Sequence, residues 1–203
     1  MSLLVFGLAL AALAGVPDGI RPVAAPVDVP AQYAAFLEKS GKKGDPLACR
    51  ELWPGQALLC FRVWEKKKRR WVTEADLASW AVTVDDLAAA TRTHAKDLIE
   101  GGLETVAVEG TTDSYVRFSD GDGWAASVAL APDVIAAKLG LPFLAAIPAE
   151  GVFVAWSPGK PELDYIMAVG VRELHDQQDG SVSPKVHAWD GQRWTPFGEA
   201  KSR

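Results

Sequence analysis

FLAAIPAEGVFVAW, residues 143–156, holds two short apolar runs on either side of a turn sequence. Residues 143–147 and 152–156 have the length and the aromatic and β-branched content of strands. Residues 148–151 (PAEG) between them suit a tight connection. We therefore predict a pair of strands in this stretch.

The segments after this strand pair also follow clear patterns. Residues 160–176 predict a helix with one apolar stripe, formed by Leu163, Ile166, Met167, Gly170, Val171 and Leu174. A glycine on this stripe costs about 1 kcal/mol of helix stability relative to alanine, which predicts the close approach of a strand backbone there. The chain then closes with a predicted hairpin, residues 185–189 and 192–197, around Asp190-Gly191.

The segments before the strand pair predict a mixture of short helices and strands. Thr73 with Asp76 and Thr83 with Asp86 resemble capping boxes at two helix starts, and Gly101-Gly102 ends the second helix. Other elements are predicted as helices over 31–39 and 132–139 and as strands over 58–64, 105–109, 115–118 and 124–130, with residues 120–123 as a turn. Tight hairpins without a regular strand–helix–strand alternation predict a single α+β domain, with a mainly antiparallel sheet and several packed helices.

The N-terminal residues 1–14 form an apolar, uncharged run that ends in small residues, as before a signal-peptidase site. We predict an export signal over 1–14, although it lacks the usual basic start, then a Pro-rich linker over 15–30 and the domain over 31–203. The run is shorter than the roughly 20 residues that span a bilayer, so no transmembrane segment is expected in the mature chain. The alternative is a cytoplasmic protein that buries this apolar N-terminus against its core.

Cys49 and Cys60 are the two cysteines of the chain. In an oxidising compartment they form one disulfide around a short loop, which agrees with a periplasmic or secreted location. Two reduced, buried thiols are the alternative. A catalytic cysteine is disfavoured because no nucleophile motif surrounds either residue.

A basic turn, RVWEKKKRRW over 62–71, stands out in a chain whose formal net charge is −5. Its candidate binding residues are Trp64, Lys66, Lys67, Lys68, Arg69, Arg70 and Trp71. Basic groups beside aromatic rings suit phosphates and stacked bases. The acidic composition and the predicted export instead favour an anionic envelope component or a protein partner, with no nucleic acid. The alternative is a solvated hairpin tip that discourages edge pairing.

Four segments, taken in order, carry a resemblance to a known family: residues 77–87, 123–132, 146–154 and 183–194. Over about residues 71–197 the chain resembles the YtpQ-like family of bacterial proteins, a domain-of-unknown-function family. It departs from the family pattern at His94, where an Asn-Leu pair is usual. The resemblance implies an α+β fold and brings no activity with it.

The sequence contains no recognisable motif for catalysis, nucleotide binding or metal binding. The chain has no Gly-x-Ser-x-Gly elbow, phosphate loop or dinucleotide fingerprint, and His94, His175 and His187 lack the spacing of a zinc site. Catalytic residues are therefore unknown, and no metal or cofactor is expected. Asp113 with Asp120, or Glu150 with Glu162, are conceivable acid–base pairs that only proximity in the sequence supports. We interpret the chain as an exported, non-catalytic binding domain for a protein or cell-envelope component. The alternatives are an extracytoplasmic hydrolase with unidentified catalytic residues and the cytoplasmic protein described above.

Overall fold

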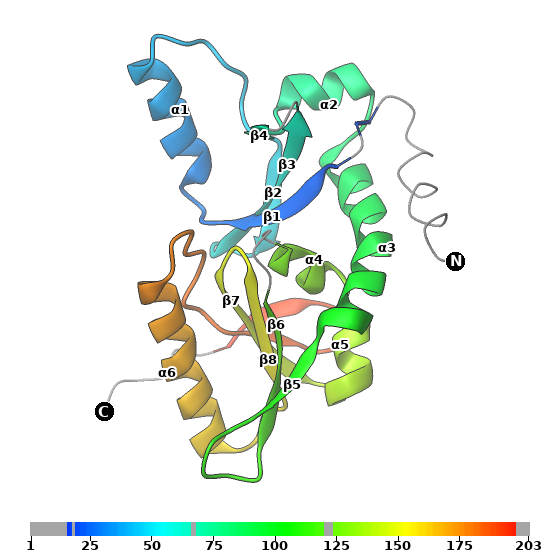
Figure 1. The fold of residues 1–203 in the computed structure, drawn as a ribbon, viewed down its shortest axis with the longest axis vertical. Helices are drawn as coiled ribbons and strands as arrows, with labels where there is room; N and C mark the ends of the chain where they lie inside the picture. Colours follow the sequence, from blue (N-terminus) through cyan, green and yellow to red (C-terminus); the bar gives the residue numbers. More distant parts are fainter. Residues whose placement is uncertain (1–15, 18, 66–67, 120–123, 198–203) are drawn as a thin grey trace.

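The computed structural model describes residues 16–17, 19–65, 68–119 and 124–197 (Figure 1). The strands are β1 Arg21–Ala25, β2 Cys49–Trp53, β3 Ala57–Glu65, β4 Lys68–Trp71, β5 Glu104–Ala107, β6 Ser114–Ser119, β7 Phe143–Ala149, β8 Val152–Trp156, β9 His187–Trp189 and β10 Trp194–Pro196. The helices are α1 Val29–Lys39, α2 Glu74–Trp80, α3 Val84–Gly102, α4 Ala125–Leu130, α5 Pro132–Leu139 and α6 Pro161–Gln177. These helices and two antiparallel sheets confirm the predicted α+β class. The export signal predicted over 1–14 and the turn predicted over 120–123 lie outside the described residues.

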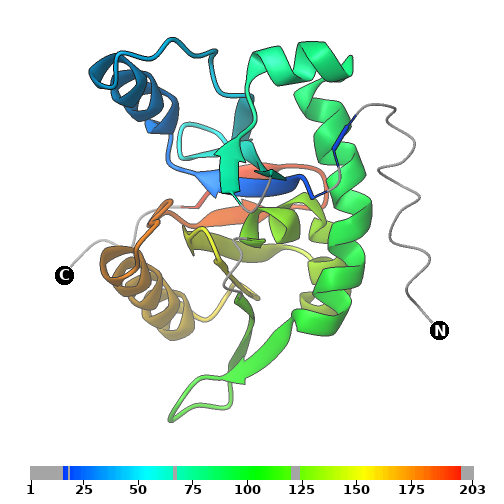
Figure 2. The same ribbon diagram turned by 45° about the horizontal axis from the view of Figure 1, so that its top comes forward.

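The six-stranded sheet has the order β10-β9-β7-β8-β6-β5, which places the predicted strand pair, β7 and β8, at its centre. Leu144 and Val154 belong to the core beneath α6, whereas Phe143 and Phe153 face the core shared with α4 and the other sheet. Figure 2 shows α6 on one side of this sheet and α3 on the other. Because both faces are covered, β7 and β8 are buried along their whole length. This burial explains the continuous apolar sequence of the two strands.

The four-stranded sheet is built around β3. β1 pairs with one edge of β3, and β2 and β4 pair in succession with its other edge. Trp53 and Phe61 of this sheet belong to the same hydrophobic core as Phe143 and Phe153 of the six-stranded sheet. One continuous core therefore joins the two sheets, as the prediction of a single domain requires.

The prediction of a Pro-rich linker over residues 15–30 is wrong for its central part. Arg21–Ala25 form β1, in which Val23, Ala24 and Ala25 are buried. Pro22 is tolerated because β1 is an edge strand, where a missing N–H is least costly. The small side chains of β1 also allow α4 to pack against it. The domain therefore begins before residue 31, and α1 starts at Val29.

Two helix starts follow the capping chemistry predicted from the sequence. Thr73 and Thr83 each accept a hydrogen bond from the backbone N–H three residues later, on Asp76 and Asp86. Each aspartate carboxylate accepts in return from the N–H of its threonine, so both capping boxes are confirmed.

The strand predicted over residues 124–130 is wrong, because this segment forms α4. Residues 125–129 of α4 are all buried, between β1, α3 and the six-stranded sheet. A helix that is buried on every side has no polar face, so its sequence lacks the helical alternation of apolar and polar residues.

The close approach predicted at Gly170 is also wrong. A Cβ atom at this position would have no neighbour within 4 Å in the described structure. Tight packing therefore does not explain why a glycine lies on the apolar side of α6.

Candidate functional site

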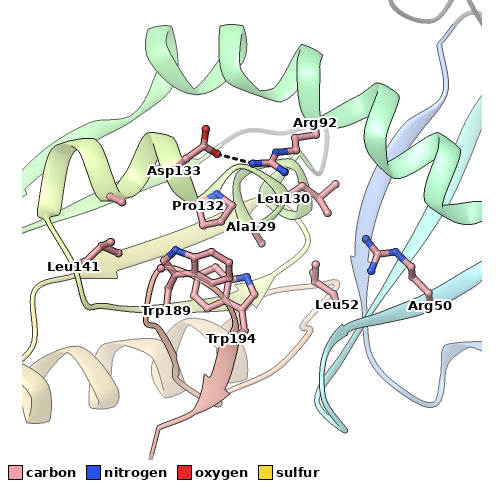
Figure 3. A pocket seen from close by; sticks show the side chains of 12 residues that line it. Arg50, Leu52, Arg92, Ala129, Leu130, Pro132, Asp133, Leu141, Trp189 and Trp194 are labelled. Carbon is pink, nitrogen blue, oxygen red and sulfur yellow. Dashed lines mark hydrogen bonds and ion pairs between the residues drawn. The ribbon is translucent and has the colours of Figure 1, made fainter.

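A pocket of about 500 Å³ lies where the four-stranded sheet, the C-terminal hairpin and helices α3, α4 and α5 meet (Figure 3). β2 contributes Arg50 and Leu52 to its lining, and α3 contributes Arg92. The remaining lining residues are Ala129, Leu130, Pro132, Asp133, Ala136, Leu141, Trp189, Gly191 and Trp194. The pocket thus combines apolar surface with two arginines and one carboxylate.

Two tryptophans form the aromatic wall of the pocket. Trp189 and Trp194 are cross-strand partners in the β9–β10 hairpin, and their ring centroids lie 5.1 Å apart. Behind Trp194 lie Trp53, at 5.4 Å between ring centroids, and Phe143, at 5.6 Å in an edge-on arrangement. Since these rings pack against buried aromatics, the wall is held in place and offers a fixed surface on which a ring can stack.

The charged groups of the pocket are arranged as ion pairs. The Arg92 guanidinium lies 3.2 Å from one carboxylate oxygen of Asp133, and Lys96 Nζ lies 2.6 Å from the other. Arg50 Nε lies 3.1 Å from Asp85, whose side chain is 82% exposed. Two cations share one carboxylate in the first group, so the rim of the pocket carries a surplus of positive charge.

The titration of Asp133 is set by its cationic neighbours. The hydrogen bond from Lys96 lowers the pKa of Asp133 most, partial burial raises it, and the bond from Arg92 lowers it again, so the pKa lies below its ordinary value. Asp133 is therefore ionised at neutral pH and holds no proton to donate. Arginine stays protonated at any ordinary pH.

The described lining of the pocket offers few groups for acid–base or nucleophilic catalysis. Among the described lining residues, Asp133 is the only carboxyl group, and none is a Ser, Thr, Cys, His, Tyr or Lys. General acid catalysis needs a proton donor that titrates near the working pH, and a hydroxyl or thiol nucleophile needs an activating base. The Asp133 carboxylate is ionised and is engaged by Arg92 and Lys96. What the pocket can do is hold a ring against its tryptophans and an anion against its arginines.

The predicted basic turn forms the β3–β4 hairpin, with its aromatic and basic groups in contact with one another. Trp64 lies opposite Arg69, and Arg62 lies opposite Trp71. The Arg69 guanidinium lies 4.5 Å from the Trp64 ring centroid, and that of Arg62 lies 4.1 Å from the Trp71 ring centroid. Arg21 also contacts Trp64, at 5.8 Å. These cation–π contacts stabilise the sheet internally and occupy part of the ring surface that a stacked ligand would need.

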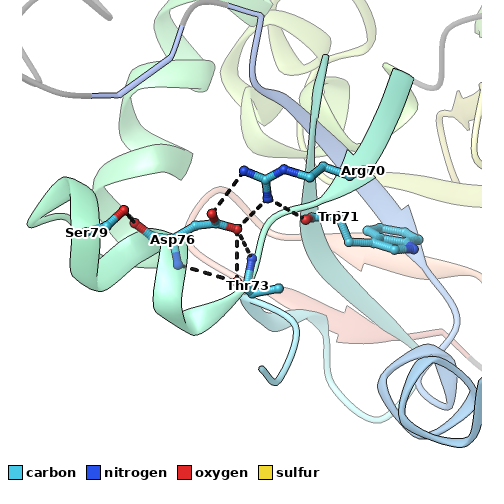
Figure 4. Close-up of polar contacts among 5 residues, drawn as sticks. All are labelled: Arg70, Trp71, Thr73, Asp76 and Ser79. Atoms are coloured by element: carbon cyan, nitrogen blue, oxygen red, sulfur yellow. Dashed lines mark hydrogen bonds and ion pairs between the residues drawn. The ribbon is translucent and has the colours of Figure 1, made fainter. Parts of the chain in front are cut away.

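The Arg70 side chain points to the side of the hairpin opposite Trp71 and contacts α2 (Figure 4). Its guanidinium donates to both carboxylate oxygens of Asp76, at 2.6 and 3.0 Å, and to the carbonyl oxygen of Trp71, at 3.1 Å. Partial burial raises the pKa of Asp76, but the bonds from Arg70 and Thr73 lower it more, so the net pKa lies below its ordinary value. Arg70 therefore joins β4 to the start of α2.

Ligand binding by Trp64, Lys68, Arg69, Arg70 and Trp71 stays a prediction. Their internal contacts favour the alternative of a stabilising hairpin, in which Lys68 and Arg69 are exposed. Lys66 and Lys67 lie outside the described residues.

Other residues considered from the sequence have structural partners. Cys49 and Cys60 are directly opposed on β2 and β3 and form the predicted disulfide. Glu150, a conceivable catalytic acid, accepts two hydrogen bonds from Arg62, at 2.8 and 2.9 Å, and so joins the β7–β8 turn to β3. His187 is buried against Trp53.

The described residues include no group of three or more His, Cys, Asp or Glu side chains placed to hold a metal ion. None of the helices in the described part of the chain combines the length and apolar composition needed to cross a membrane.

The pocket residues were missed by sequence reasoning. Arg50, Arg92 and Asp133 lie far apart in the chain, and nothing local distinguishes them from ordinary surface charges. The tryptophans gave only a partial signal. The Asp190-Gly191 turn predicts a hairpin, but a two-residue turn would pair residue 189 with residue 192. In the structure residues 190–193 separate the strands, and this register places Trp189 and Trp194 opposite each other.

The comparisons with known proteins add no relationship to these observations. No protein-family model matches the chain, and neither the curated proteins nor the solved structures gave a match. The resemblance to the YtpQ-like family therefore stays a prediction, and the function of the pocket must be argued from its own geometry.

Proposed function

We propose that this protein is a non-catalytic binding domain whose pocket takes an anionic, ring-bearing component of the cell envelope, such as an acidic sugar. The observation that carries this proposal is the Trp189–Trp194 wall beside Arg50 and Arg92, where the described lining residues include no hydroxyl, thiol or imidazole group. Sugar rings present apolar C–H faces that pack on tryptophan, and arginine binds carboxylates with paired hydrogen bonds.

The ion pairs at the rim are compatible with ligand exchange. The side chains of Arg92 and Asp133 are 51% and 47% exposed, and exposed pairs of this kind contribute between about 0 and 1 kcal/mol. A ligand carboxylate therefore competes for Arg50 and Arg92 at low cost. Lys96 continues to neutralise Asp133 when Arg92 turns to the ligand.

We also propose a periplasmic or secreted location. The Cys49–Cys60 disulfide supports it, because such bonds persist in oxidising compartments and are rare in the cytosol. The apolar sequence of residues 1–14 supports it independently, as a predicted export signal. An acidic envelope sugar is a ligand that an exported domain meets.

Calorimetric titration with two probes tests the proposed ligand class. A galacturonate oligosaccharide is expected to bind, and an uncharged malto-oligosaccharide of equal length is expected to bind at least about tenfold more weakly, the equivalent of one charged hydrogen bond. Arg92→Gln should remove this preference. Arg193→Gln is the matched control, because Arg193 lies in the same hairpin turn, 79% exposed and outside the pocket lining.

Two results would contradict the proposal. Equal affinity for both probes, or none for either, would remove the case for an acidic-sugar pocket. Cleavage of the oligosaccharide during the titration, lost in Arg92→Gln, would favour the hydrolase alternative.

A further inference from the structure

The outer side of α6, away from the tryptophan pocket, carries an apolar strip beside a second hollow. Tyr165, Ile166 and Val169 are 56%, 44% and 38% exposed and lie within two turns of one another on this helix. The hollow has a volume of about 230 Å³ and lies between α6 and strands β5, β6 and β8. Single exposed apolar side chains are ordinary, but a contiguous strip beside an apolar hollow marks an interaction surface.

Gly170 keeps this hollow open. It lines the hollow together with Ile166 and Leu174, and a Cβ atom there would have no neighbour within 4 Å among the described residues, apart from the backbone of α6 itself. A glycine in the middle of a helix is less stabilising than an alanine, and no neighbouring residue is close enough to require a glycine here. The structural effect of Gly170 is therefore the empty space beside the helix. A guest on α6 can therefore reach the sheet beneath the helix.

The size of the hollow favours one inserted side chain. Pockets for small ligands usually measure about 300–1,000 Å³, so a hollow of about 230 Å³ is small for a free ligand. Its walls include Val108, Tyr115 and Val154, which are apolar or aromatic. A large apolar side chain entering such a hollow is the usual anchor of a protein interface.

Charges around the strip identify the kind of partner. Glu162, Ile166, Val169 and Glu173 follow one another at spacings of four, three and four residues, so they form one stripe with carboxylates at both ends. Within the described part of the chain, no ion pair is formed by Glu162, by Glu173 or by Glu109, which lies at the rim of the hollow. Two copies of α6 packed antiparallel would oppose these glutamates to one another, which disfavours self-association. A partner with basic residues is complementary.

We propose that α6 is a docking face for a protein partner whose binding segment inserts one Leu, Phe or Trp side chain beside Gly170 and places Lys or Arg against Glu162 and Glu173. This face is independent of the acidic-sugar pocket, because α6 covers the other side of the six-stranded sheet (Figure 2). A variant that no longer binds the protein partner can therefore still be tested for binding of the acidic sugar, and the reverse.

Selection from a displayed library of random twelve-residue peptides tests the proposal on the full chain. Sequences enriched on the wild type, after removal of those that bind Gly170→Leu, are expected to hold a large apolar residue flanked by Lys or Arg. Their affinity, measured by fluorescence polarisation, should fall at least tenfold for Gly170→Leu, which fills the hollow. It should fall much less for Gly170→Ala, the matched control that leaves most of the hollow open. Glu173→Lys should also weaken binding, and its effect should shrink at high salt.

Three results would overturn the proposal. The first is a selection in which no peptide distinguishes the wild type from Gly170→Leu, provided that thermal melting shows Gly170→Leu to be folded. The second is enrichment of acidic rather than basic flanks. The third is sedimentation of the wild type as a dimer that Ile166→Lys converts to a monomer, which would assign the strip to self-association.

Discussion

Acidification is expected to destabilise this protein through His187, which lies in the core at the back of the aromatic cluster. Its side chain has no measurable exposure, and its ring stacks on Trp53 with a centroid separation of 4.4 Å. Neither ring nitrogen has a hydrogen-bond partner in the described structure. Burial lowers the pKa of His187 from its ordinary 6.5 to about 4, because a charged imidazolium here would be desolvated and unpaired.

The sign and size of the effect follow from this change in pKa. The unfolded chain binds a proton at His187 near pH 6.5, whereas the folded chain does so only near pH 4, so protonation favours unfolding between these values. The free energy of unfolding is fully retained above pH 6.5 and falls as the pH is lowered to about 4. The total loss is about 3 kcal/mol, at about 1.4 kcal/mol for each tenfold change in proton concentration.

Urea unfolding of the wild type and of His187→Phe, followed by circular dichroism at about pH 7 and about pH 4.5, measures this loss. The phenylalanine keeps a ring against Trp53 but cannot titrate, so the wild type should lose between about 2 and 3 kcal/mol more than the variant. Asp76 and Asp133 contribute little to the difference, because their lowered pKa values put their protonation at still lower pH and both proteins retain them. An equal loss of stability in both proteins would show that His187 is not the group responsible.

Three further predictions concern stability at neutral pH. Gly170→Ala should raise the free energy of unfolding by about 1 kcal/mol, because alanine favours the helix and its methyl group would meet no other element of the described structure within 4 Å; a lower melting temperature would contradict this. Replacing Cys49 and Cys60 together by serine should lower it by roughly 3 kcal/mol, given a sequence separation of 11 residues. A reductant should weaken the wild type similarly and leave this double variant unchanged. Asp76→Ala should lower the free energy of unfolding by roughly 2 kcal/mol, since it removes the aspartate half of a capping box and an arginine partner, whereas Asp86→Ala, which removes only the aspartate half of a box, should lower it by less. Equal losses in urea titrations of these two variants would show that the arginine pair adds nothing.

Much of the fold could be predicted because its signals are local. The capping boxes at Thr73 and Thr83 join residues three positions apart, so these helix starts do not depend on contacts with distant parts of the sequence. The apolar runs of β7 and β8 and the stripe of α6 also follow from short-range periodicity. The disulfide could be predicted from the lone cysteine pair, which the β2–β3 register then brings face to face.

The errors arise where tertiary burial outweighs a local pattern. Residues 21–25 have the proline and small side chains of a linker, but pairing with β3 and packing beneath α4 make them a strand. Residues 124–130 have the alternating pattern of a strand, but residues 125–130 form a helix. Because this helix is buried on all sides, it does not need a polar face. In both cases the deciding contacts come from elements far away in the sequence.

The fold class, two capped helix starts, the central strand pair and the disulfide follow from the amino-acid sequence alone, because each depends on residues close together in the chain or on the single pair of cysteines. The candidate site instead depends on how the chain folds. Arg50, Arg92, Asp133, Trp189 and Trp194 lie on five different elements and meet because the two sheets share one core. The layering of those sheets depends on how apolar surface is buried across the whole molecule, which short-range periodicity does not specify.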